Sequence, residues 1–79
     1  MAYKVERNLC TGGFCCHFEH AGERYYADVS HTFDHGSECM IFPEDVWDEL
    51  YTKWNVPVTR EGLISCIEEF VRGLEEEKR

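Results

Sequence analysis

Residues 25 to 33 alternate between two kinds of side chain, and this alternation constrains the fold more than any other feature of the sequence. One set is mostly apolar and consists of Tyr25, Ala27, Val29, His31 and Phe33. The other set is mostly polar and consists of Tyr26, Asp28, Ser30, Thr32 and Asp34. Because successive side chains of an extended chain point to opposite faces, the pattern predicts a β-strand with one buried face.

The strand predicted just before it, over residues 14–20, has an apolar face of its own, formed by Phe14, Cys16 and Phe18. Ala21 and Gly22 can form a two-residue hairpin loop between the two strands. In that register apolar residues oppose apolar residues, whereas a slip of one residue would set Phe14 and Phe18 against polar residues. The expected pairs are His20–Glu23, Glu19–Arg24, Phe18–Tyr25, His17–Tyr26, Cys16–Ala27, Cys15–Asp28 and Phe14–Val29.

A second hairpin is expected around Asp34–Ser37, where Gly36 can take a positive φ. A two-residue loop at His35 and Gly36 suits a type I′ turn and is preferred. The pairs it predicts are His31–Met40, Val29–Phe42 and Thr32–Cys39. A three-residue loop would instead place Cys39 on the face of His31. Another strand, over residues 3–9, comes first in the chain, and whether it pairs beside the second or the fourth strand is left open.

Two helices are predicted after the strands, over residues of about 44–55 and 60–76. Proline and acidic residues at 43–45 suit a first helical turn. The first apolar stripe is Val46, Trp47, Leu50, Tyr51 and Trp54. Asn55 is the expected C-cap of that helix, and Thr59 is the expected N-cap of the next. The second apolar stripe is Leu63, Ile64, Ile67, Phe70, Val71 and Leu74.

The sequence therefore predicts one α+β domain over residues 1–79. Its fold is a four-stranded antiparallel β-meander followed by two α-helices packed on one face. The strands are expected at about residues 3–9, 14–20, 24–33 and 38–42, and residues 75–79 are expected to fray.

Charge and cysteine usage limit the classes of function. The net charge of −8 repels nucleic acids and anionic membranes, so direct binding to either is not expected. No apolar run is long enough to span a membrane, and the first ten residues lack the apolar segment of a signal peptide. Five cysteines, an odd number, favour reduced thiols. We expect a cytoplasmic protein.

The first candidate site combines Cys15, His17 and Asp28, which the predicted register brings to one face. Thiolate, imidazole and carboxylate are the ligand types of zinc. The fourth ligand could be Cys10, His20, His35 or Cys39. The spacing matches no standard zinc finger, and a partly solvated strand face is the alternative interpretation. The same three residues could also act as a nucleophile, its base and an orienting group.

A second candidate is the series His31, His35 and Cys39, but it spans a turn and the preferred register separates His31 from Cys39. We expect His31 to be buried at the boundary between sheet and helix, so that its protonation would destabilise the fold. The pair Gly12 and Gly13 is expected to be a turn, because it lacks the lysine and the helix of a phosphate loop.

A third candidate is the edge of the second helix that carries Gly62, Cys66 and Gly73. Two glycines inside a helix cost about 0.5–1 kcal/mol each relative to alanine, which suggests that another backbone approaches closely. Packing of the first helix against this edge is the favoured explanation, and a contact with another subunit is the alternative.

The last candidate is an acidic surface on the helices. It consists of Glu44, Asp45, Asp48, Glu49, Glu61, Glu68 and Glu69. It could simply be solvated, or it could bind a basic protein. The function expected first is a non-enzymatic module for protein–protein binding or regulation, with no cofactor. The alternatives are a small zinc-binding protein and an acidic inhibitor, of the kind that some phages use, that occupies the nucleic-acid site of another protein. A homodimer through an exposed sheet edge is left open.

Overall fold

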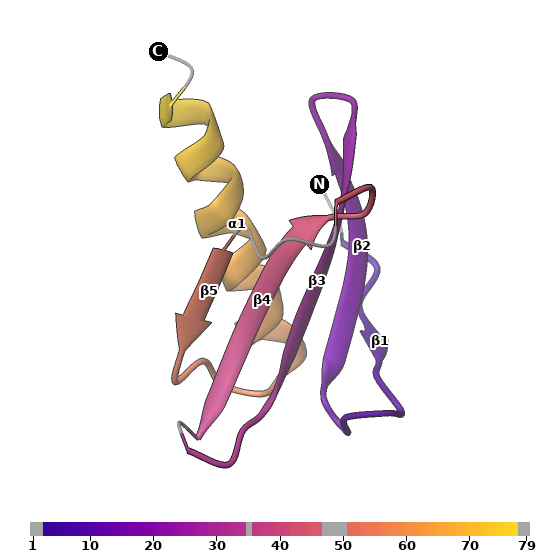
Figure 1. Cartoon of the computed structure of the whole chain (residues 1–79), viewed down its shortest axis with the longest axis vertical. Coiled ribbons are helices and arrows are strands. Elements are labelled where there is room, and N and C mark those ends of the chain that lie inside the picture. The colour runs from indigo at the N-terminus through magenta and orange to yellow at the C-terminus, as the bar shows by residue number, and fades with distance from the viewer. Residues whose placement is uncertain (1–2, 35, 47–50, 78–79) are drawn as a thin grey trace.

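The computed structural model describes residues 3–34, 36–46 and 51–77, and its centre is a five-stranded antiparallel sheet with the strands in sequence order. The strands are β1 (Glu6–Arg7), β2 (Phe14–His20), β3 (Glu23–His31), β4 (Ser37–Pro43) and β5 (Tyr51–Trp54). One helix, α1 (Arg60–Glu77), follows and crosses one face of the sheet, behind the strands in the view of Figure 1. The predicted fold of four strands and two helices is therefore wrong.

The register of the β2–β3 hairpin is confirmed at all seven predicted pairs, from His20–Glu23 to Phe14–Val29. Its loop has φ angles of 53° at Ala21 and 82° at Gly22, as the two central residues of a type I′ turn require. The apolar pattern of the two strands and the length of the loop both specify this register.

The predicted register of the β3–β4 hairpin is wrong. Val29 pairs with Cys39 and Ala27 pairs with Ile41, so the connection between the strands is longer than two residues. This register buries Cys39 and Ile41 fully beneath α1, whereas the predicted one would have turned both away from the core. Cys39 lies on the face that a three-residue loop would have given it, although its partner is Val29.

The end of β3 also differs from the prediction. His31 is exposed and does not lie at a buried boundary between sheet and helix. Phe33 follows the strand and is fully exposed, with a relative accessibility of 105%. The burial from which the acid destabilisation was predicted is therefore absent at His31.

The predicted first helix is replaced, in its last residues, by β5, which pairs antiparallel with β4. Its sequence from Tyr51 to Trp54 is rich in residues that favour strands, and the pairing supplies backbone partners to β4. Asn55 then takes a φ of 60° and donates its backbone N–H to the Ser37 carbonyl at 2.9 Å. Asn55 thus adopts the left-handed conformation that a C-cap needs, but it ends a strand. Trp47 and Leu50 of the predicted stripe lie outside the described residues.

The first strand is shorter than predicted and pairs with β2 through Glu6–Cys15 and Arg7–Phe14. Helix α1 begins as expected, because the Thr59 hydroxyl accepts a hydrogen bond of 2.9 Å from the Gly62 backbone N–H. The helix continues to Glu77, further than the predicted fraying allowed.

The core lies between α1 and the sheet face that it covers. The helix contributes four buried side chains, Leu63, Cys66, Ile67 and Phe70. The sheet contributes Cys16, Phe18, Tyr25, Ala27, Val29, Cys39 and Ile41. The rings of Phe70 and Tyr25 pack edge-on with their centroids 5.2 Å apart, a favoured aromatic geometry.

Candidate binding site on the outer face of the sheet

The face of the sheet opposite α1, called here the outer face, carries partly exposed aromatic and polar side chains. By their pairing these are Cys15, His17, Tyr26, Asp28, Met40, Phe42, Thr52 and Trp54. Asp28 is buried, His17 and Trp54 are exposed, and the others are half-buried. Among the described residues no helix lies on this face.

Three rings form a row across the outer face, from β2 through β3 to β4. Tyr26 pairs with both His17 and Phe42. The ring centroids of His17 and Tyr26 are 4.9 Å apart at an angle of 56°, and those of Tyr26 and Phe42 are 5.5 Å apart at 51°. Because neighbouring rings are inclined, they border a hollow rather than a flat stack. A pocket of about 340 Å³ lies there, lined by His17, Tyr26, Phe42 and Glu44.

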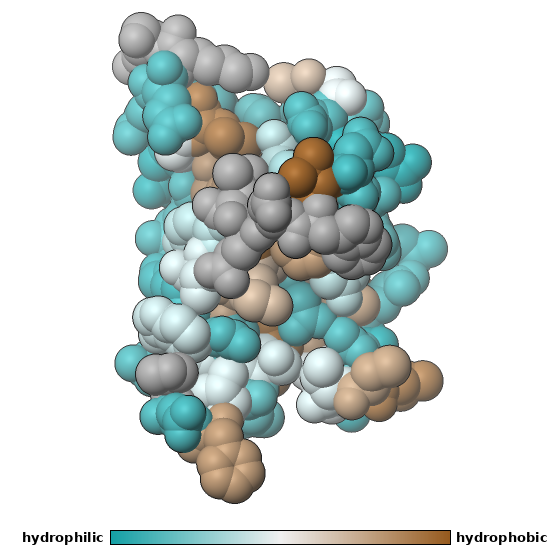
Figure 2. Space-filling view, in the orientation of Figure 1, coloured by the Kyte–Doolittle hydropathy of each residue, from teal (hydrophilic) through white to brown (hydrophobic). Residues whose placement is uncertain are grey.

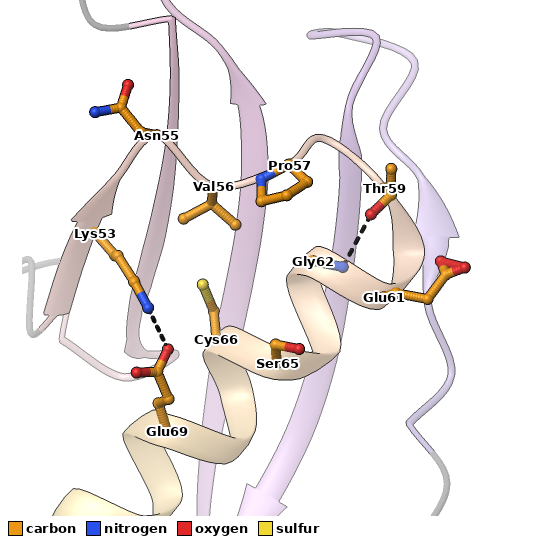
Figure 3. A pocket seen from close by; sticks show the side chains of 10 residues that line it. All are labelled: Lys53, Asn55, Val56, Pro57, Thr59, Glu61, Gly62, Ser65, Cys66 and Glu69. Atoms are coloured by element: carbon orange, nitrogen blue, oxygen red, sulfur yellow. Dashed lines mark hydrogen bonds and ion pairs between the residues drawn. The ribbon is translucent and has the colours of Figure 1, made fainter.

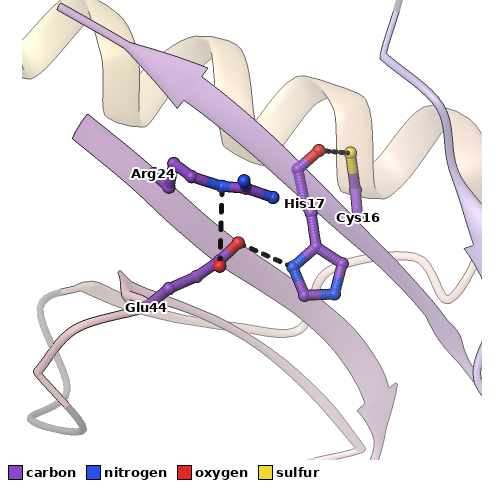
Figure 4. Close-up of polar contacts among 4 residues, drawn as sticks. All are labelled: Cys16, His17, Arg24 and Glu44. Atoms are coloured by element: carbon purple, nitrogen blue, oxygen red, sulfur yellow. Dashed lines mark hydrogen bonds and ion pairs between the residues drawn. The ribbon is translucent and has the colours of Figure 1, made fainter. Parts of the chain in front are cut away.

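Glu44 supplies the charged wall of this pocket, directly after β4 (Figure 4). Its backbone N–H donates to the Arg24 carbonyl at 3.0 Å, which holds the residue beside β3. Its Oε2 lies 2.8 Å from His17 Nδ1, and its Oε1 lies 3.6 Å from Arg24 Nε. A carboxylate only accepts hydrogen bonds, so Nδ1 of His17 carries the hydrogen in this contact.

The hydroxyl of Tyr26 is held by Asp28, which lies two residues further along β3. It donates to Asp28 Oδ2 at 3.2 Å, and Asn8 Nδ2 donates to the same oxygen at 2.5 Å. Burial, and then the charge of Asp28, raises the pKa of the Tyr26 phenol far above its ordinary value. The phenol therefore stays neutral, and the ring is held in place.

The predicted zinc residues are only partly brought together. Cys15 pairs with Asp28 as expected, but Nδ1 of His17 contacts Glu44 and Asp28 accepts from Tyr26 and Asn8. Of the proposed fourth ligands, Cys10 is exposed, His20 ends β2 and Cys39 is buried on the other face, while His35 is not among the described residues. No three His, Cys, Asp or Glu side chains within residues 3–34, 36–46 and 51–77 are grouped to hold a metal ion.

The second candidate series is separated. His31 is exposed at the end of β3, Cys39 is buried under α1, and His35 lies outside the described chain. The predicted series of nucleophile, base and orienting group is not assembled as expected, because the carboxylate that contacts Nδ1 of His17 belongs to Glu44 and not to Asp28.

A second pocket, of about 330 Å³, lies between β5 and the first turns of α1 (Figure 3). An ion pair between Lys53 and Glu69 joins the strand to the helix at its edge. The Cys66 thiol points from the helix toward the sheet, where a hydrogen bond with Cys39 lowers its pKa. The same bond, together with burial, raises the pKa of Cys39. Lys53 and Glu69 neutralise each other, and Glu61 is a third charged residue of the lining.

The glycines on the edge of α1 have different surroundings. A Cβ at Gly62 would lie 2.1 Å from the carbonyl oxygen of Pro57, so the close approach of the segment before the helix requires glycine here. A Cβ at Gly73 would meet no described atom within 4 Å. The predicted packing by a first helix is wrong, because the close neighbour of Gly62 is the segment leading into its own helix.

The predicted acidic surface is divided among several environments. Glu44 faces the pocket of the outer face, and Glu69 is paired with Lys53. Asp45, Glu61, Glu68 and Glu69 are all exposed. Asp48 and Glu49 lie outside the described residues.

Apolar side chains also project from the lower end of the molecule in Figure 2, where Figure 1 shows the β1–β2 and β3–β4 connections. Leu9 and Phe33 lie in these connections and are 87% and 105% exposed. They form separate projections, and no pocket joins them among the described pockets.

The sequence predicted part of the outer face and missed the rest. His17 and Tyr26 follow from the β2–β3 register, whereas Ile41, which the predicted β3–β4 register turned away from the core, is buried in it. Phe42 lies on the outer face in its place. The contact of Glu44 with His17 joins residues 27 positions apart, and no local pattern in the sequence indicates it.

No protein-family model, curated protein or solved structure matches this chain. Within the described residues, α1 is the one helix, and it is too polar to cross a membrane.

Proposed function

We propose that this protein is a non-enzymatic binding module that uses its outer face to bind a basic segment of a partner protein. The observation that carries the proposal is the contrast between the two sides of one sheet. The side under α1 is closed and apolar, whereas the outer face presents partly exposed rings and a carboxylate. Partly exposed aromatic side chains are enriched where proteins bind one another.

The charge of the chain selects the kind of partner. A net charge of −8 attracts basic protein surfaces and disfavours direct binding to nucleic acids. A basic surface that otherwise binds nucleic acid would meet the same requirement, so the inhibitor hypothesis is one case of this proposal. The five unpaired thiols support a reducing compartment, and we propose the cytoplasm.

The test uses two peptides of equal length, one alternating glycine with lysine and one alternating glycine with glutamate. Calorimetric titration at low ionic strength and near neutral pH should detect binding of the lysine peptide alone. Added salt should weaken that binding, because exposed charges are screened. Equal binding of both peptides, or no binding of the lysine peptide at low salt, would contradict the proposal.

A further inference from the structure

The pocket on the outer face combines two features that recognise the same chemical group. Three rings, from His17, Tyr26 and Phe42, border it, and the carboxylate of Glu44 completes its wall. The face of an aromatic ring attracts a cation, and a carboxylate adds a full negative charge. We propose that this pocket binds the alkylammonium end of a lysine side chain, bare or N-methylated, from the basic partner; the proposal rests on the function proposed above.

The geometry fits a compact cation on a stem. The rings are inclined at 56° and 51° to their neighbours, and all three line the pocket. Its volume of about 340 Å³ exceeds what a bare ammonium group fills, so methyl groups can be accommodated. Cations attracted to rings bind within about 6 Å of the ring centroid. Because neighbouring centroids are 4.9 and 5.5 Å apart, one cation can lie within that distance of two rings.

The rings of Tyr26 and His17 are held by hydrogen bonds before any ligand binds. The hydrogen bond from Tyr26 to Asp28 fixes the central ring, and Asn8 holds the same carboxylate oxygen. His17 is held by its contact with Glu44. A site that is ordered in advance loses less entropy when its ligand arrives.

Arg24 already occupies the cation position at Glu44, and it does so loosely. Its side chain is 70% exposed, and its Nε lies 3.6 Å from the Glu44 oxygen. A ligand cation would replace it at this carboxylate. Removal of the Arg24 charge should therefore strengthen binding of the ligand, an effect opposite to that expected if Arg24 only supports the fold.

The experiment compares three small probes by nuclear magnetic resonance titration of the whole chain. They are lysine amide acetylated at its α-nitrogen, trimethyllysine amide acetylated at its α-nitrogen, and the neutral isostere of the second, in which carbon replaces the quaternary nitrogen. Both cations should shift the ring signals of Tyr26 and Phe42, and trimethyllysine should bind about five-fold more tightly than its neutral isostere. Equal binding of the isostere would overturn the proposal, because it would leave only an apolar pocket.

Matched variants separate the pocket from general charge effects. Phe42→Leu should weaken trimethyllysine binding about five-fold, whereas Phe42→Tyr, which keeps the ring, should not. Glu44→Gln should weaken it more than Glu68→Gln, and Arg24→Gln should strengthen it more than Arg72→Gln, because each control carries the same change of charge outside the pocket. If both members of each pair behave alike, the assignment of the pocket is wrong.

The two proposals can fail separately. Binding of the lysine peptide with no response to the pocket variants would overturn the pocket and leave the binding module. Binding of the trimethyllysine probe without binding of the lysine peptide would overturn the proposed basic partner and leave the proposed cation pocket standing.

Discussion

The two faces of the sheet carry residues from the same strands but differ in burial: one forms the core and the other borders a pocket. The face under α1 contains fully buried side chains such as Val29 and Ile41, which have no contact with water. The outer face is built from the residues next to them in sequence, and its rings remain partly exposed around a pocket. Because neighbouring side chains of a strand point to opposite sides, one set of alternate residues can stabilise the fold while the other set is available for binding.

The largest effect is expected from the core face. Ile67→Ala removes a fully buried side chain and should lower the free energy of unfolding by about 2–5 kcal/mol. Met40→Ala removes a half-buried side chain from the outer face and should cost about 1 kcal/mol or less. Urea denaturation of both variants measures this difference. Equal losses would show that the outer face is as much a part of the core as the inner one.

The next test concerns how α1 is attached to the core face. Gly62→Ala places a Cβ against the Pro57 carbonyl and should destabilise the fold by about 1–3 kcal/mol. Gly73→Ala meets no described atom and should stabilise the helix by about 0.5–1 kcal/mol. Thermal unfolding of the two variants should therefore shift in opposite directions, and shifts of the same sign would contradict the account.

A third test uses the raised pKa of Tyr26 on the outer face. Because the folded protein holds this phenol in its neutral form, the stability it contributes is complete below about pH 10, the pKa of an unperturbed tyrosine, and is lost as the pH rises further. Tyr26→Phe should cost about 0.5–1.5 kcal/mol near neutral pH, since it loses the bond to Asp28. It should also reduce the fall of the urea midpoint above pH 10. An unchanged alkaline profile would contradict the role of this phenol.

The smallest effect is expected in the β2–β3 loop, which belongs to neither face. Ala21 has a φ of 53°, which an asparagine tolerates better than an alanine. Ala21→Asn should raise the free energy of unfolding by about 0.5–1 kcal/mol. It should leave binding of the lysine peptide unchanged, and a loss of binding would show that the loop contributes to the interface.

The sequence predicted the β2–β3 hairpin because two independent signals agreed there. The apolar pattern and the two-residue loop at Ala21 and Gly22 specify the same register. At the next hairpin, Gly36 is compatible with turns of several lengths, and only the burial of Cys39 and Ile41 under α1 selects the observed one. That selection depends on tertiary packing, which a local pattern does not contain.

The predicted first helix failed for a similar reason. Tyr51 and Trp54 fit an apolar helical stripe and also fit a strand, and the pairing of β5 with β4 decides between the two. The error carried over to the site, because the predicted register placed Phe42 in the core and the predicted helix placed Glu44 on an acidic surface. Both residues line the pocket beside Tyr26.

The most direct test of the division between the two faces is a map of backbone amide shifts when the lysine peptide is added to the isotope-labelled protein. We predict that the shifts gather on the outer face, at residues such as His17, Tyr26 and Glu44, and spare the exposed side of α1 around Glu68. Shifts centred on α1, with the outer face unchanged, would contradict the account.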